Sequence, residues 1–104
     1  MYVTTIETVP GKTIVASHGI VSGSSVRAKH VGRDIMAGVK NVFGGELKGY
    51  TELLAESRDQ ALSRMKNEAA ELGANGIVNI RFSTSSVTAG ASEIYVYGTA
   101  VTVE

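Results

Sequence analysis

The sequence predicts an α+β fold with two layers: an antiparallel sheet that carries helices on one face. Segments rich in β-branched residues lie near both ends of the chain, and two segments with helical periodicity lie between them. The last two β-rich segments follow each other closely enough to form a hairpin. At 104 residues the chain has room for one hydrophobic core, so we expect a single domain over residues 1–104.

The first strand is predicted over residues 12–23, KTIVASHGIVSG, because β-branched residues dominate it and a Gly/Ser cluster ends it. A helix is predicted over residues 25–43, with Ser24 or Ser25 as its N-cap and the glycine pair 44–45 as its end. Its apolar positions recur at threes and fours: Ala28, Val31, Ile35, Val39 and Val42.

A second helix is predicted over residues 51–72, where Glu, Arg, Lys and Ala are frequent, and Gly73 is its expected stop signal. The side chains expected to face the sheet are Leu54, Ala61, Met65, Ala69 and Leu72. The pair Asn75-Gly76 then predicts a turn.

The hairpin is predicted from two alternating segments. Val78, Ile80 and Phe82 alternate in a short strand, residues 83–92 are small and polar as in a connecting loop, and residues 93–104 form the last strand.

Both faces of that last strand are apolar. One carries Ile94, Val96, Gly98 and Ala100, and the other carries Tyr95, Tyr97, Val101 and Val103. A sheet covered on one side only normally has a polar second face. We therefore expect the protein to associate with itself as a homo-oligomer; the alternative is that the N-terminal arm folds across the open face.

Composition excludes several functions. The chain has no cysteine, which excludes disulfides and thiolate metal sites. Ten basic residues balance ten acidic ones without a basic run, so we expect no nucleic-acid partner. The start resembles no signal peptide and no segment is long and apolar enough to span a membrane, so we expect a cytoplasmic protein with no membrane partner.

Most of the chain, from residue 12 onward, resembles the YbjQ-like family of small bacterial proteins, whose label proposes heavy-metal binding. The residues that carry the resemblance are Arg33-Asp34, Gly44-Gly45, Gly49-Tyr50, Arg58, and the segments LGANGIV and YGTAV. The resemblance implies a dodecin-like α+β subunit assembled into a ring, a pentamer. It implies no established activity.

The glycine-rich stretch around Gly44, Gly45 and Gly49, followed by Tyr50, is a candidate anion site because backbone N–H groups before a helix can bind phosphate. Its spacing matches neither the P-loop nor the dinucleotide pattern. The alternative is a turn between two helices, in which the glycines allow close backbone approach.

Arg58 lies close to the line of residues expected to face the sheet, so we expect its guanidinium to face packed surface. A buried guanidinium needs a carboxylate partner, and Asp34, Glu46 and Glu52 are candidates. The alternative role is to bind an anion beside the glycine-rich stretch.

A divalent metal ion is the one cofactor the sequence suggests. His30 and Asp34 are four residues apart, on one face of the expected first helix, and His18 could be a third ligand. The alternative is a solvated polar helix face, and the absence of cysteine argues against soft heavy metals.

No nucleophile–base motif or carboxylate pair is evident, so we expect no enzyme but a homo-oligomeric binding protein. Two alternatives stay open: an enzyme or anion-binding protein with a site between subunits around Arg58, Tyr50 and the loop of residues 44–49, and a purely structural assembly. Tyr95 and Tyr97 are expected to anchor an interface or line a pocket.

Overall fold

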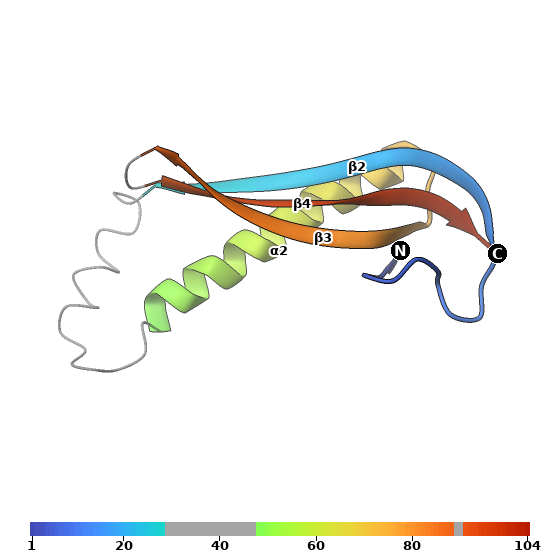
Figure 1. Ribbon diagram of the computed structural model, residues 1–104, viewed down its shortest axis with the longest axis horizontal. Coiled ribbons are helices and arrows are strands. Elements are labelled where there is room, and N and C mark those ends of the chain that lie inside the picture. The colour runs from blue at the N-terminus through green and yellow to red at the C-terminus, as the bar shows by residue number, and fades with distance from the viewer. Residues whose placement is uncertain (29–47, 89–90) are drawn as a thin grey trace.

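The computed structural model describes residues 1–28, 48–88 and 91–104. It confirms the α+β class: a four-stranded sheet with one described helix against it (Figure 1). The elements are β1 (Tyr2–Val3), β2 (Ile14–Ala28), α2 (Lys48–Glu71), β3 (Gly76–Thr88) and β4 (Ala91–Val103).

The strand order is β1-β3-β4-β2. β4 is antiparallel to both β2 and β3, as expected, but β1 runs parallel to β3, so the sheet is mixed. β1 is only two residues long, too short for a periodic signal in the sequence.

The helix expected over residues 25–43 is wrong at its start. β2 continues to Ala28, and Ser24 and Ser25 pair with Tyr95 and Ile94 of β4 instead of capping a helix. Pairing with a long neighbouring strand outweighs the helical periodicity here. The rest of that prediction lies outside the described residues.

The loop expected over residues 83–92 is also wrong. β3 extends to Thr88 and β4 begins at Ala91, so most of the Ser/Thr-rich stretch is paired strand. β3 also contains a bulge, and this bulge places on opposite faces two residues that the alternating pattern predicted on the same face. Asn79 has a φ of 54° inside a bulge, and the bulge sends Val78 and Ile80 to opposite faces of the sheet.

The predicted helix of residues 51–72 is confirmed and begins three residues earlier, at Lys48. Its end follows the Schellman pattern. Gly73 adopts a φ of 84°, its N–H donates to Ala70 O at 3.0 Å, and the Ala74 N–H donates to Ala69 O at 3.1 Å. The glycine therefore ends the helix as expected and turns the chain into β3.

The core lies between α2 and one face of the sheet. Its centre consists of fully buried side chains from four elements: Ala61, Met65 and Ala69 of α2, Val21 of β2, Ile77 of β3, and Val96 and Ala100 of β4. Small side chains allow α2 to lie very close to the sheet. At Gly23 of β2 an added Cβ would meet backbone atoms of Ala61 and Met65.

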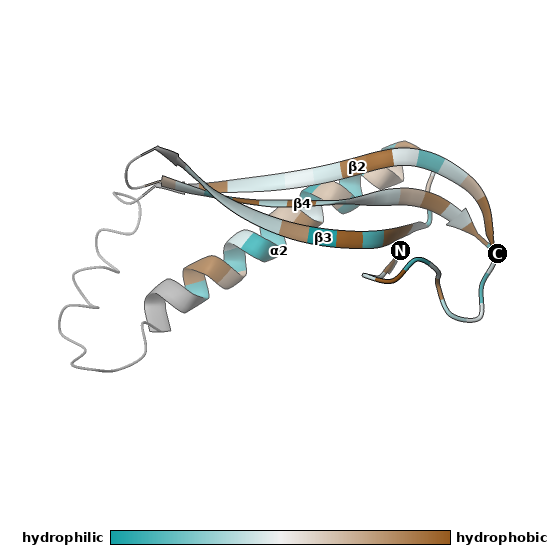
Figure 2. Ribbon diagram, viewed as in Figure 1, coloured by the Kyte–Doolittle hydropathy of each residue, from teal (hydrophilic) through white to brown (hydrophobic). Residues whose placement is uncertain are grey.

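One helix is too narrow for this sheet. A helix with its side chains is about 10–12 Å wide, whereas strands lie about 4.8 Å apart. α2 therefore covers roughly two strands, β2 and β4, and Phe82 on the same face of β3 stays 48% exposed. Figure 2 shows that apolar residues also occur along β2, β3 and the N-terminal segment, outside the helix contact.

Candidate functional site

The sheet face opposite α2, here called the outer face, divides into a covered end and an open centre. At the covered end Val9 of the N-terminal arm (residues 1–13) packs with Val78, Val101 and Val103. Val101 is 2% exposed and Val103 is 4% exposed, so these side chains at this end of β4 are buried from solvent. The expected alternative, an arm folded across the open face, therefore holds for this end of the sheet.

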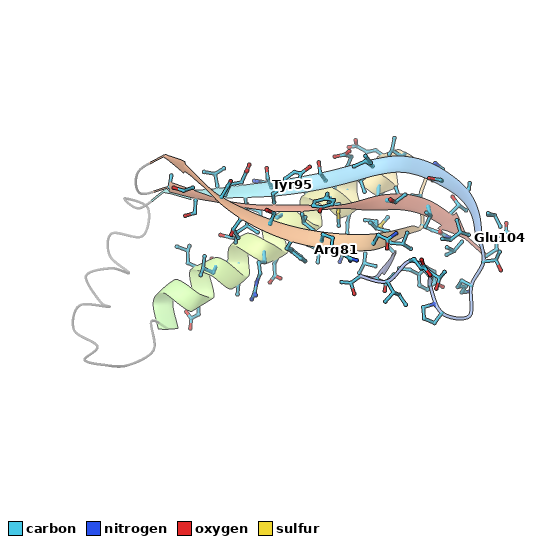
Figure 3. All side chains as sticks on the ribbon, viewed as in Figure 1. Arg81, Tyr95 and Glu104 are labelled. Carbon is cyan, nitrogen blue, oxygen red and sulfur yellow. The ribbon has the colours of Figure 1, made fainter. Side chains whose placement is uncertain are left out.

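The arm is held in place by several hydrogen bonds along β3. The Tyr2 N–H donates to Asn75 O, the Thr4 N–H donates to Ile77 O, and Arg81 Nη1 donates to Thr5 O at 2.7 Å. Figure 3 labels Arg81 on β3 and Tyr95 on the neighbouring strand β4. These contacts fix the arm at one end of the outer face and leave the centre uncovered by it.

The open centre is defined by four exposed apolar side chains, and we call it the tyrosine face: Ile20, Val26, Tyr95 and Tyr97. Ile20 is 78% exposed, and Tyr95 and Tyr97 are 37% and 40% exposed. The two tyrosine rings lie 5.7 Å apart, centroid to centroid.

The neighbours of the two tyrosines on this face are polar. Ser24 and Ser83 pair with Tyr95, whereas Ser22 and Arg81 pair with Tyr97. An exposed surface that combines tyrosines with an arginine has a composition that is common in protein interfaces.

Arg58 does not face packed surface, contrary to the expectation from its position near the apolar line. Its side chain is exposed, as is that of Glu52, so it needs no buried partner. The other two candidate partners, Asp34 and Glu46, lie outside the described residues. The buried residue is its neighbour Ser57, which is 0% exposed. Successive helix residues are rotated by about 100°, so an error of one position exchanges a buried side chain for an exposed one.

Ser57 is the residue that the sequence prediction missed. It precedes Ala61, Met65 and Ala69 by steps of four, and this spacing was the available signal. Nearby, the buried Ser25 donates a hydrogen bond to Gln60 Oε1 at 2.8 Å. The Ser57 hydroxyl has no hydrogen-bond partner among the described residues.

We expect Ser57→Ala to stabilise the protein by about 1 kcal/mol. The substitution removes a buried, unpaired hydroxyl and introduces a better helix former. Urea unfolding followed by circular dichroism measures the change, with the exposed Ser63→Ala on the same helix as a control for helix propensity alone. Destabilisation by Ser57→Ala would mean that the hydroxyl has a partner in solution.

The three candidate metal ligands are only partly placed by the structure. His18 lies half-buried at a bulge of β2, and its Nε2 atom is 2.7 Å from the Thr102 hydroxyl. His30 and Asp34 lie outside the described residues. Among the residues that are described, no three His, Asp or Glu side chains come together as a metal site would require.

The glycine-rich stretch is likewise partly placed. Gly44 and Gly45 lie outside the described residues, whereas Gly49 and Tyr50 belong to the first turn of α2. Gly49 and Arg58 are nine residues apart in this helix, which separates them by about 13 Å along the axis and places them on opposite sides. Within one subunit they do not share a site, so an anion site that uses both requires two copies of the chain.

The fold and the outer face together define a small α+β domain whose sheet is partly open on both faces. The chain belongs to the YbjQ family, whose model, described as "putative heavy-metal-binding", matches residues 1–104.

Relatives of the chain occur in bacteria and in archaea. A UPF0145 protein of Hahella chejuensis is 64% identical over 104 residues, which is the full length of both chains. A UPF0145 protein of Archaeoglobus fulgidus is 54% identical over 99 residues, covering 95% of this chain and 92% of the relative. The family is therefore broader than the bacterial one that the sequence suggested.

A solved structure shares the fold. It is a protein of unknown function from the DUF74 family of Pediococcus pentosaceus, with a TM-score of 0.69 and 20% sequence identity, covering 100% of this chain and 98% of the other. No helix in the described part of the chain is long and apolar enough to cross a membrane.

Proposed function

We propose that this protein is a homo-oligomeric binding protein without enzymatic activity, built from dodecin-like subunits in a pentameric ring. The observation that carries the proposal is the tyrosine face, which one helix and one arm leave open to water. A monomer seldom exposes two tyrosines and large aliphatic side chains together on one sheet face. Tyr95 and Tyr97 are of the residue type that most often anchors interfaces.

The ligand that we propose is a divalent metal ion held by His18, His30 and Asp34. The contact of His18 with Thr102 supports a ligand role for this histidine. If the Thr102 hydroxyl accepts a hydrogen bond from Nε2–H, the tautomer leaves Nδ1 as the coordinating nitrogen, and such outer hydrogen bonds orient metal-binding histidines. A ring would also bring several copies of an incomplete ligand set into one particle.

Native mass spectrometry of the untagged protein, combined with elemental analysis and a Zn²⁺ titration, tests this proposal. We expect an oligomer with bound metal in a fixed ratio to subunits, and loss of the metal in His18→Ala and His30→Ala. Thr102→Val, which removes the hydroxyl but no ligand, is the matched variant and should weaken binding about 10-fold or more. An oligomer without bound metal, or as much metal in each histidine variant as in the wild type, would contradict the ligand assignment.

The alternative ligand is a small anion between subunits, at Arg58 of one copy and the Gly44, Gly45, Gly49 and Tyr50 stretch of another. The exposure of Arg58 favours it, because a neighbouring copy can reach the guanidinium. An enzyme with its active site between subunits would use the same junction. In the same samples, inorganic phosphate should raise the melting temperature of the wild type but not of Arg58→Ala, with both remaining oligomeric.

A further inference from the structure

Asn75 lies between the end of α2 and the start of β3, and each of its polar groups is hydrogen-bonded. Its backbone N–H donates to Val101 O of β4 at 3.1 Å, and its backbone O accepts from the Tyr2 N–H of β1 at 2.9 Å. Its side-chain Nδ2 donates to Val103 O at 3.0 Å, and its Oδ1 accepts from the Val103 N–H at 2.8 Å. Asn75 therefore ties β1 and the end of β4 to the start of β3.

The carboxamide of Asn75 takes the place of a paired strand residue. The pairing of β3 with β4 begins at Gly76 and Val101, so no residue of β3 lies opposite Val103. The side chain offers Val103 one donor and one acceptor, as the backbone of a neighbouring strand would. An ionised aspartate has the same shape but only acceptors, so it cannot bind Val103 O.

The residue that follows Asn75 makes this carboxamide chemically labile. Asparagine is among the thermolabile residues of proteins, and before glycine it is least hindered, because glycine has no side chain to shield its nitrogen. The Gly76 nitrogen loses its proton and bonds to Cγ of Asn75, and Nδ2 leaves as ammonia. Water then opens the cyclic imide. Cleavage at Cγ gives aspartate, and cleavage at the backbone carbonyl gives isoaspartate.

We propose that Asn75 is a deamidation site that the native fold protects, and that its conversion loosens the N-terminal arm and the end of β4. This inference goes beyond the proposed function and does not depend on self-assembly. Aspartate at this position would place a carboxylate against Val103 O, where Nδ2 now donates. Isoaspartate would add one atom to the backbone between α2 and β3. Both products weaken the same tie.

The native contacts oppose the first step of the reaction. Ring closure moves Cγ toward the Gly76 nitrogen, so the carboxamide must give up both hydrogen bonds to Val103. Gly76 is buried and paired with Tyr2 on one side and Val101 on the other, which restricts the turn of the backbone that brings the two atoms together. The reaction therefore proceeds from molecules in which this end of the sheet has opened.

Peptide mass spectrometry of native and guanidinium-unfolded protein, aged side by side at mildly alkaline pH, tests the protection. Trypsin releases residues 67–81 as one peptide, in which Asn67 and Asn79 serve as internal controls because Glu68 and Ile80 follow them. We expect the unfolded chain to deamidate at Asn75 alone, and the native protein to do so about 10-fold or more slowly. Equal rates in the two states, or an unfolded chain that stays intact at Asn75, would overturn the proposal.

Gly76→Ala is the matched variant for the chemistry. An added Cβ comes no closer than 3.4 Å to another atom, the Val101 Cγ2, so the fold should accept it. Its methyl group hinders the attacking nitrogen, so the unfolded variant should deamidate much more slowly than the unfolded wild type. Equal rates in the two unfolded chains would contradict attack by the nitrogen of residue 76.

Thermal unfolding of Asn75→Asp tests the effect of the conversion. Asn67→Asp, which makes the same charge change at an exposed position of α2, is the control. We expect the melting temperature of Asn75→Asp to lie about 5 °C or more below that of the control. Hydrogen exchange in the arm, residues 1–13, should also be faster in Asn75→Asp. Equal melting temperatures and equal exchange would show that the carboxamide does not hold these segments.

Discussion

Replacement of Gly23 with alanine is expected to lower the free energy of unfolding by about 3 kcal/mol or more, which is the upper range for overpacking a core. A Cβ at this position of β2 would collide with the carbonyl oxygen of Ala61 and would lie 2.7 Å from the Met65 nitrogen. Both atoms belong to the backbone of α2, so no side-chain rotation relieves the contact. The helix must move away from the sheet, which separates the two layers of the core.

Gly11→Ala is the control for this measurement. Gly11 has no atom within 4 Å of an added Cβ, but its φ of 77° is unfavourable for alanine. The expected loss is about 1 kcal/mol from backbone conformation alone. Urea unfolding at one fixed protein concentration compares the two variants, because the stability of an oligomer depends on concentration. Equal losses would mean that α2 does not lie against Gly23 in solution.

Met65→Ala is expected to cost about 2–5 kcal/mol, the range for truncating a large buried aliphatic side chain. Met65 is 0% exposed and lies at the centre of the core between α2 and the sheet. Its truncation leaves a cavity that the surrounding strands cannot fill.

Leu72→Ala provides the comparison for Met65→Ala, since the sequence placed both residues on the line that faces the sheet. Leu72 is 46% exposed, so its truncation should cost less than about 1 kcal/mol. The same unfolding assay measures both. A large loss for Leu72→Ala would place this residue in a contact that one copy of the chain does not contain, such as a subunit junction.

In α2 the periodic pattern of apolar residues predicted the buried positions at the centre of the helix correctly. Ala61, Met65 and Ala69 are buried as expected, because a long amphipathic helix ending in glycine has a clear pattern. The pattern is less reliable at the two ends of the line, where Leu54 and Leu72 are exposed, and Leu72 already follows the last residue of α2.

The strands show why the rest could not be predicted. Ser24 and Ser25 suit a strand and a helix N-cap equally well, and only pairing with β4 decides between them. The short β1 and the bulge at Asn79 depend on contacts between the N-terminal arm and β3, and these contacts leave no pattern in the sequence.

The sequence predicted only part of the candidate site. Alternation in β4 placed Tyr95 and Tyr97 together on one face, and the structure confirms that placement. The alternating pattern could not show that Val9 covers Val101 and Val103 at one end of this face. The metal prediction depends mainly on His30 and Asp34, outside the described residues, and stays a prediction.

The mass of the untagged protein in dilute solution tests the central claim most directly. We expect light scattering to give several times the subunit mass of 10.9 kDa, and about five times that mass for the proposed pentamer. A particle of one subunit mass, stable and soluble with Tyr95, Tyr97 and Ile20 facing water, would contradict the account.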